Sequence, residues 1–490
     1  MPSTFAVPHL APGVTREYLL RHRVCPIRTP RGGGLALAVT SDHAAHAITE
    51  LVAAYGDVLD MTSVGDAELD QLVERLVTED ARTRDPGRDA VDDGDLGLED
   101  VRELANQPPV VRYVNLLVRE AHDAHASDIH LEATRQGVVA RFRLDGVLHP
   151  APDPPRALER AVVSRLKAMA ELDVTERRSP QDGRIRVRLE DRELDLRIST
   201  VPTVHGESVV LRLLDRGGRP VALDELGMGS AVLAMVQSAI ERPHGMLLVT
   251  GPTGSGKTTT LYAALQCRSA QREKIVTVEE PVEYQLDGVT QVPVHRQTNV
   301  TFASALRAIL RQDPDVVMIG ETRDAETAGI AVQAAMTGHL VLSTLHTNDA
   351  LGAIPRLIDL DVPAYLVAAT VELIVAQRLV RRLCTTCAVR ASADPTRIGL
   401  LDRDADANMP VWCSVGCDAC RGTGFRGRTG VFEALRITDE IRRVIVRGGD
   451  QVALREASTP DAYAPLTSHA LALVREGVTT LEEALRAVRA

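Results

Sequence analysis

The residues from Gly251 to Thr258 read GPTGSGKT, which fits the phosphate-binding pattern Gly-x-x-x-x-Gly-Lys-[Ser/Thr]. The glycines let successive backbone N–H groups point at phosphate oxygens, and the N-terminus of a following helix adds a favourable dipole. In this pattern Lys257 reaches the β- and γ-phosphates, and the Thr258 hydroxyl binds Mg²⁺. We therefore expect ATP to be held by this whole loop: Gly251, Pro252, Thr253, Gly254, Ser255, Gly256, Lys257 and Thr258.

Three later segments read as buried strands that end in acidic residues or a histidine. These segments are 274–280 with Glu279 and Glu280, 315–321 with Glu321, and 339–346 with a histidine at each end, His339 and His346. The carboxyl ends of parallel strands meet at the edge of a sheet where ligands bind. Glu279, Glu280, Glu321 and His346 are therefore expected to project toward the phosphate loop.

These side chains suit phosphoryl transfer to water, which needs in-line positioning of the water and neutralisation of charge on phosphate oxygens. Glu321 is the first candidate for orienting water and helping to hold Mg²⁺, and Glu279 is the second candidate for activating water. Glu280 is expected to contact the metal through its water shell. His346 either senses the γ-phosphate or has a structural role, and the sequence leaves both open.

Two Cys-x-x-Cys pairs form the second strong signal. Their four thiols belong to Cys384, Cys387, Cys417 and Cys420, and a long insert separates the pairs. Four thiolates in two such turns match a tetrahedral structural Zn²⁺ site that leaves no position open for water. Cys413 lies nearby and is an alternative ligand, but it lacks the two-residue spacing.

Several short alternating strands between residues 138 and 214 carry many arginines. The arginines on one face are Arg184, Arg186, Arg188, Arg197 and Arg212. One interpretation is a solvated sheet face. The sharper one is that some of these guanidinium groups reach the triphosphate of a neighbouring subunit.

The elements that must position these residues fill a long chain of ordinary composition. The chain has 490 residues, 44% of them hydrophobic and only 3% aromatic, with a formal net charge of −11. The negative charge gives no general attraction to nucleic acid. The sequence shows no secretory leader and no uncharged apolar run of about 18 residues. We expect an intracellular protein whose contact with a membrane is made only through partners.

The expected organisation is a multidomain α/β protein. Its parts are a small N-terminal α/β domain (1–78), an acidic flexible linker (79–107), an arginine-rich α+β domain (108–218), a phosphate-loop core with a doubly wound parallel sheet (219–380), a tetracysteine lobe (381–430) and a C-terminal helical region (431–490). A strand is expected at 35–39 and helices at 42–54 and 110–121. The apolar stretch 363–376 reads as a buried helix.

Longer motifs resemble those of the ATPases of type II secretion and type IV pilus assembly, and most closely the secretion branch. They are ASDIHLE (126–132), RLDG (143–146), SPQDGRI (179–185), LDLRIST (194–200), HGESVVLRLL (205–214), TVEEPVEY (277–284), LRAILRQDPDVVMIGETRD (306–324) and AAMTGHLVLSTLHTNDA (334–350). The resemblance extends from residue 108 to the C-terminus. Two positions depart from it: Glu280 stands where the family usually has aspartate, and Thr322 where it usually has an apolar residue.

The resemblance implies a RecA-like core, a PAS-like arginine-rich domain before it, and a homo-hexameric ring of cytoplasmic ATPase subunits. By motif, Arg184 and Arg197 complete the ATP site, with Arg212, Arg307 and Arg323 as weaker candidates. His339 and His346 occupy the histidine box and are expected to contribute to cofactor binding. The short N-terminal domain is expected to dock on the cytoplasmic part of an inner-membrane secretion platform protein, at the inner face of that membrane.

The function that these observations favour is ATP hydrolysis that drives pseudopilus assembly and protein export. A type IV pilus extension ATPase would have the same chemistry. A nucleic-acid translocase and a nucleotide-gated binding module without turnover are alternatives of other classes. The net charge and the scarcity of aromatic residues argue against nucleic acid as a partner.

Overall fold

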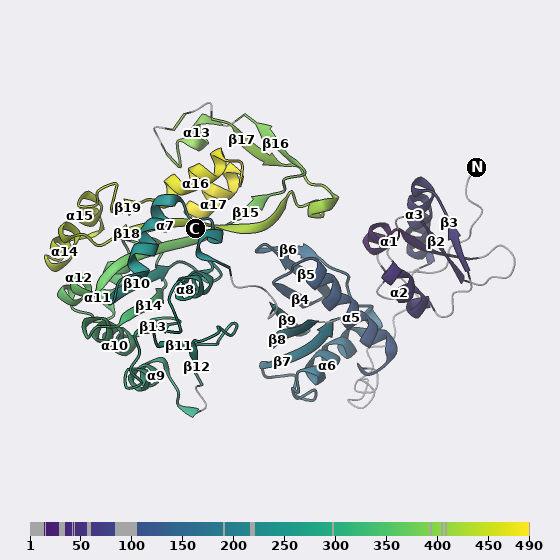
Figure 1. The fold of residues 1–490 in the computed structure, drawn as a ribbon. Coiled ribbons are helices and arrows are strands. Elements are labelled where there is room, and N and C mark those ends of the chain that lie inside the picture. Colours follow the sequence, from purple (N-terminus) through teal and green to yellow (C-terminus); the bar gives the residue numbers. More distant parts are fainter. Residues whose placement is uncertain are drawn as a thin grey trace. The chain divides into compact units, whose positions relative to one another are not determined.

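The computed structural model describes residues 14, 16–28, 35–41, 43, 45–55, 60–83, 105–189, 192–215, 221–295, 298–392, 394–402, 405–406 and 409–489. The chain divides into two compact units, Met1–Gly217 and Gly218–Ala490 (Figure 1). Most of the expected linker, residues 84–104, lies outside the described residues. Among the described helices, none is both long and apolar enough to cross a membrane.

The N-terminal part of the first unit is a small α/β domain. Its elements are α1 (Arg16–His22), β1 (Val24–Arg28), β2 (Leu35–Val39), α2 (Ala45–Tyr55), β3 (Asp60–Ser63) and α3 (Asp66–Thr83). β2 pairs antiparallel with β1 and parallel with β3. Leu19, Leu37 and Leu72 are fully buried in its core. The expected strand and helix are both present, but α3 runs to residue 83, so the predicted boundary at 78 falls inside a helix and is wrong.

The second part of this unit is a six-stranded antiparallel sheet with the strand order β6-β5-β4-β9-β8-β7. Its elements are α5 (Pro108–Asp123), β4 (Asp128–Thr134), β5 (Gly137–Leu144), β6 (Val147–Pro150), η1 (Arg156–Leu158), α6 (Glu159–Met169), β7 (Gln181–Leu189), β8 (Arg192–Thr203) and β9 (Gly206–Asp215). Alternate strand residues such as Ile185, Leu196 and Leu211 are buried with α5 and α6. The arginines between them therefore occupy the other face.

The second unit is built on an eight-stranded sheet with the order β12-β11-β13-β14-β10-β15-β18-β19. These strands are β10 (Gly245–Thr250), β11 (Ile275–Glu279), β12 (Thr290–Pro293), β13 (Val316–Ile319), β14 (Leu340–Leu345), β15 (Val371–Leu383), β18 (Phe425–Arg436) and β19 (Tyr463–Ala464). The strands from β12 to β15 are parallel, and β18 and β19 add an antiparallel edge. The central strands are buried over their whole length, as a sheet covered on both faces requires.

Helices pack on both faces of this sheet, which makes it doubly wound as predicted (Figure 1). They are η2 (Leu223–Leu226), α7 (Ser230–Ile240), α8 (Lys257–Gln266), α9 (Phe302–Ile309), α10 (Ala325–Met336), α11 (Ala353–Asp359), α12 (Ala364–Thr370), α14 (Asp439–Val446), α15 (Gln451–Glu456), α16 (Leu466–Arg475) and α17 (Leu481–Arg489). α9, α10 and α12 share one apolar cluster with the sheet, and α7 and α8 share the other.

The tetracysteine lobe is inserted between two neighbouring strands of this sheet, β15 and β18. It contains β16 (Ala388–Ala391), α13 (Pro395–Ile398), β17 (Val411–Ser414) and η4 (Asp418–Cys420). The stretch 363–376 is not one helix: α12 ends at Thr370 and β15 begins at Val371, so that prediction is wrong. The core also does not end at residue 380, because β18 returns from the lobe and pairs along β15. A run of apolar residues cannot distinguish a buried helix from a buried strand.

Candidate nucleotide and metal sites

The phosphate loop lies where the sequence places it, between the buried strand β10 and the helix α8. Gly251, Gly254 and Gly256 have φ angles of 143°, 79° and 86°. Side-chain-bearing residues rarely adopt this region, so the curl of the loop depends on these three glycines. Pro252 and Thr253 at the tip are exposed.

Lys257 is the first residue of α8, and its side chain folds back over the loop. Its Nζ donates to the carbonyl oxygens of Gly251 at 2.7 Å and Pro252 at 3.0 Å. Burial lowers the pKa of Lys257, nearby Glu321 raises it, and Arg378 lowers it. Within the described part of the chain, the hydrogen bonds of this ammonium group go to backbone carbonyls of the loop itself, which phosphate oxygens can replace.

Glu321 lies close to the phosphate loop and belongs to a small charged group. One of its carboxylate oxygens is 2.6 Å from Nε of Arg323 and 3.6 Å from Nε2 of His346. Burial lowers the pKa of His346, Lys257 lowers it further, and Glu321 raises it. Of the residues predicted to meet at this site, Lys257, Glu321 and His346 are therefore brought together.

Glu279 has a different environment, because it is 2% exposed at the end of β11. Its Oε1 accepts hydrogen bonds from the Thr277 hydroxyl at 2.5 Å and the Gln291 amide at 3.1 Å. Its Oε2 accepts one from the Tyr262 hydroxyl. Burial raises the pKa of Tyr262, and its bond to Glu279 raises it further. The carboxylate is held in a buried hydrogen-bond network, whereas the neighbouring Glu280 is exposed.

His339 does not join the residues around the phosphate loop. His339 precedes β14 and His346 follows it, so the two histidines lie at opposite ends of this strand. Its carbonyl accepts from the amide of Gly245 at the start of β10, and its Nδ1 is 2.9 Å from the Ala334 carbonyl oxygen. A six-residue strand spans about 20 Å. The expectation that His339 contributes to the nucleotide site of this subunit is therefore wrong.

Thr322, which departs from the usual apolar residue, has a polar partner. It is 4% exposed, and its hydroxyl lies 2.8 Å from that of Ser343 on β14, which is fully buried. The two hydroxyls satisfy one another, so the departure is compensated inside the protein.

In the first unit, the arginines form a row straight across the sheet. Arg184 on β7 is the register partner of Arg197 on β8, and Arg197 is the partner of Arg212 on β9. Asp128 on β4 continues the row, 3.0 Å from Nε of Arg212 and 3.7 Å from Nε of Arg143. Like charges at directly opposite positions repel. The row thus carries three neighbouring arginines and a fourth, Arg143, with Asp128 between two of them, and this excess of positive charge favours the binding of an anion at this face.

Two of these arginines pair with carboxylates of the same sheet. Arg212 pairs with Asp128, and Nε of Arg186 lies 3.7 Å from Asp195. Arg184 and Arg188 are exposed, and Arg197 is half-buried.

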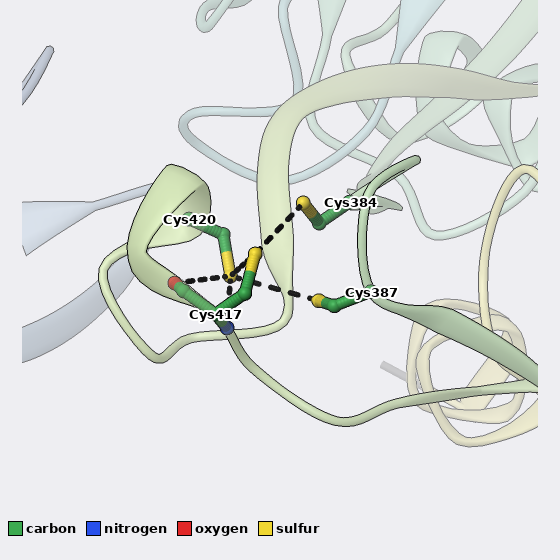
Figure 2. Close-up of side chains that lie close together, drawn as sticks. All are labelled: Cys384, Cys387, Cys417 and Cys420. Carbon is green, nitrogen blue, oxygen red and sulfur yellow. Dashed lines mark hydrogen bonds between the residues drawn. The ribbon is translucent and has the colours of Figure 1, made fainter.

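The four cysteines of the lobe converge on one point (Figure 2). Their sulfur atoms all lie within 4.8 Å of one another, and three pairs are 3.7–3.8 Å apart. Tetrahedral Zn–S bonds of about 2.3 Å place sulfurs about 3.8 Å apart. The amides of Cys417 and Gly424 point at the sulfur of Cys420 at 3.2 and 3.1 Å, which stabilises a thiolate. The residues present fit a structural zinc ion, and Cys413 is exposed and not part of the group.

These features define a doubly wound P-loop nucleotide-binding protein. They are a buried parallel strand, a glycine loop, a lysine at the start of a helix, and a charged group at the ends of the neighbouring strands. A family model described as type II/IV secretion system protein matches residues 103–486. The chain belongs to that family, as the motifs predict.

The relatives come from both branches of the family. The type II secretion system protein HxcR of Pseudomonas aeruginosa is 49% identical over 392 residues, 80% of this chain and 80% of that protein. The type IV pilus assembly ATPase PilB of Myxococcus xanthus is 39% identical over 482 residues, 96% of this chain and 85% of that protein. The solved structure of the pilus retraction motor PilT with bound ADP has a TM-score of 0.51 and 27% identity, covering 76% of this chain and 95% of PilT.

Several residues next to the site were not predicted from the sequence. Tyr262 and Gln291 hold Glu279, and Gln377 and Arg378 pack against the phosphate loop. Tyr262 is recognisable afterwards as the one tyrosine on the helix that follows the loop. Nothing in the sequence marks Gln291, Gln377 or Arg378, because their role depends on which strands become neighbours.

Proposed function

We propose that this protein is a Mg²⁺-dependent ATPase of the secretion branch of its family. The observation that carries the proposal is the phosphate loop with Lys257 facing Glu321 and His346. In this proposal Lys257 moves from the loop carbonyls to phosphate oxygens, and the Thr258 hydroxyl binds Mg²⁺. Glu321 orients the attacking water. The arrangement supplies positioning and charge neutralisation, which are what phosphoryl transfer requires.

Glu279 is the second candidate for activating water, and Glu280 contributes to the water shell of the metal. The three hydrogen bonds that Glu279 accepts support a structural role for it in the absence of nucleotide. The closeness of Glu321 to the Lys257 ammonium group and to His346 supports its assignment as the catalytic carboxylate.

We propose that the machine is a homo-hexameric ring in which Arg184 and Arg197 reach the ATP of a neighbouring subunit. The row of arginines across the first unit supports this assignment, because a triphosphate would offset its positive charge. Domain motion driven by ATP would then power pseudopilus assembly and protein export. The N-terminal domain would dock on the cytoplasmic domain of an inner-membrane platform protein, which would hold the ring at that membrane.

Phosphate release by the purified protein tests the enzymatic part. We expect release to require Mg²⁺, to rise when the platform domain is added, and to vanish in Lys257→Ala. Lys274→Ala is a matched control, because Lys274 is exposed and precedes β11, at the end of this strand opposite to Glu279. Nucleotide binding without release in any assembly state would favour a gated binding module. Stimulation by DNA would favour a translocase.

We also propose that the tetracysteine lobe holds one structural Zn²⁺, through Cys384, Cys387, Cys417 and Cys420. The sulfur–sulfur distances support it. Elemental analysis of the purified chain should give one zinc per subunit, and Cys420→Ser should lose it. Cys413→Ser is the control and should keep the metal. Zinc-free wild-type protein would contradict the proposal.

The similarity to PilB keeps one second function open, that of a pilus extension motor with the same chemistry. Binding assays with the cytoplasmic platform domains of the two machines separate them. The domain that binds more tightly and stimulates phosphate release identifies the machine.

A further inference from the structure

Gln377 and Arg378 on β15 lie directly against the phosphate loop. β15 runs parallel to β10 up to the pair Thr250 and Ala376, so the next two residues of β15 are level with the loop. A Cβ added at Gly251 would come within 3.0 Å of the Gln377 carbonyl oxygen and 3.2 Å of Nη1 of Arg378. The loop can approach β15 this closely only because residue 251 is glycine.

Gln377 also contacts the far end of the loop. Its Oε1 accepts from the Thr260 hydroxyl at 2.6 Å, and its Nε2 would be 2.9 Å from a Cβ at Gly256. Gln377 is 2% exposed and Thr260 is 1% exposed. The buried side chain of Gln377 therefore packs against Gly256, the third glycine of the loop, while it is hydrogen-bonded to the first turn of α8.

Arg378 joins this loop to the segment that follows β14. Its Nη2 donates to the carbonyl oxygen of Asn348 at 2.8 Å, although the residue is only 5% exposed. Its Nε has no hydrogen-bond partner among the described residues. Burial lowers the pKa of Arg378, and the carboxylates of Glu433 and Asp349 raise it. Burial of a guanidinium group costs desolvation free energy, so a buried arginine beside a phosphate site is expected to have a function there.

The segment after β14 carries His346 and has two further attachments. The Thr347 amide donates to the Thr250 hydroxyl at 2.8 Å, at the residue immediately before the phosphate loop. The Ala350 amide donates to Glu433 at 2.8 Å. The hydrogen bond from Arg378 to Asn348 lies between these two attachments along the segment and fixes its middle.

We infer that Gln377 and Arg378 are positioning residues, which hold the phosphate loop and the His346 segment in one arrangement so that the site distinguishes a nucleoside triphosphate from a diphosphate. The inference rests on the proposed function and on the interpretation in which His346 senses the γ-phosphate. Neither side chain needs to touch the nucleotide. Arg378 acts through Asn348 on the segment, and Gln377 acts on the backbone of the loop.

Equilibrium binding of fluorescent ATP and ADP analogues tests this without requiring turnover. In Arg378→Gln we expect the dissociation constant for the ATP analogue to rise about tenfold, which corresponds to about 1.4 kcal/mol. The value for the ADP analogue should change less than about threefold. Arg378→Lys keeps a positive charge and one donor, and should recover most of the ATP affinity.

Two further variants separate positioning from folding. Thr347→Val removes two side-chain hydrogen bonds of the segment, the one between the Thr347 and Thr250 hydroxyls at 2.8 Å and the one from the Thr347 hydroxyl to the Asp349 carbonyl at 2.9 Å. The amide bond of Thr347 to Thr250 stays, so this variant should reproduce part of the ATP-selective loss even where Arg378→Gln folds poorly. Arg381→Gln is the matched control: Arg381 lies on the same strand and donates to buried Glu483 at 2.8 Å, but packs against the C-terminal helix α17. It should lower thermal stability and leave the ratio of ADP to ATP affinity unchanged.

Equal losses for both analogues, or an unchanged ratio in both Arg378→Gln and Thr347→Val, would overturn the inference. Failure of the proposed function looks different, because wild-type protein would then bind nucleotide without releasing phosphate. The binding ratio can be measured in either case.

Discussion

The two candidate carboxylates should respond to the same substitution in opposite ways. Replacement of Glu279 or Glu321 by glutamine keeps the shape of each side chain and removes its charge. Glu279 accepts three hydrogen bonds inside the protein, whereas Glu321 lies beside Lys257 and His346. We expect Glu279→Gln to act mainly on stability and Glu321→Gln mainly on turnover.

The stability cost of Glu279→Gln follows from its hydrogen bonds. A glutamine can keep its oxygen toward Thr277 and Gln291, but its amide nitrogen then faces the Tyr262 hydroxyl. Hydrogen bonds to a charged group contribute about 1.5–3 kcal/mol each. The loss of one of these hydrogen bonds and the weakening of the other two should lower the free energy of unfolding by about 2–4 kcal/mol. For large domains 1 kcal/mol corresponds to about 2–4 °C in melting temperature, so a decrease of about 4–16 °C is expected.

The cost of Glu321→Gln should be small for folding and large for catalysis. Its side chain is 13% exposed, and that of its partner Arg323 is 61% exposed. An ion pair this open contributes about 0–1 kcal/mol. A carboxylate that orients or deprotonates water contributes about 10²–10⁴-fold to the rate. We expect kcat to fall by at least about 100-fold.

Thermal unfolding and steady-state phosphate release on the same preparations measure both effects. Binding of a fluorescent ATP analogue shows whether each variant still takes up nucleotide. The reasoning is refuted if Glu279→Gln abolishes turnover at an unchanged melting temperature while Glu321→Gln keeps its kcat. Glu279 would then have to leave its buried network when nucleotide binds.

Three other predictions concern the rest of the chain. Zinc removal or Cys420→Ser should shift the emission of Trp412, the single tryptophan, to longer wavelength, because this side chain packs within the lobe against the C-terminal region; an unchanged spectrum would argue against a structural metal. Burial lowers the pKa of His469, so below the ordinary histidine value of about 6.5 the unfolded chain binds more protons than the folded one. Stability should therefore fall as the pH decreases through 6.5 and level off above it, and urea unfolding of His469→Asn should show a weaker dependence. Lys167 is 0% exposed and donates to Glu207 at 2.7 Å, so Lys167→Met should cost about 3–5 kcal/mol in urea unfolding, and adding Glu207→Gln should recover part of it.

The phosphate loop and the cluster of four cysteines were predictable because each is defined by residues close together in sequence. The eight-residue loop is recognisable from its own residues and needs only a strand before it and a helix after it. The charged group of Glu321 and His346 was also predictable, since both follow parallel strands of the same sheet. The same rule places His339 at the opposite edge, because it precedes its strand.

The contacts of Glu279 and the course of β15 could not be predicted in the same way. Tyr262, Thr277 and Gln291 come from a helix and two strands, and only the completed sheet brings them to one carboxylate. The stretch 363–376 has helical and extended parts with similar hydrophobicity. The change from helix to strand at Thr370 depends on the pairing of β15 with β10 on one side and with β18 on the other.

The position of the lobe in the sheet suggests a structural role for the tetracysteine cluster. β15 and β18 pair antiparallel as far as Leu383 and Phe425. The tetracysteine lobe begins directly after Leu383 and ends directly before Phe425. The Cys384 amide continues the ladder by donating to the Gly424 carbonyl at 3.0 Å. A metal bound by Cys384 and Cys420 would therefore close the open end of this ladder and reduce the entropy of the long insert. Because β15 also carries Gln377 and Arg378, one strand connects the closed ladder with the phosphate loop. With a metal bound, the antiparallel edge of the parallel sheet would let the tetracysteine lobe stabilise the strand that lies against the phosphate loop.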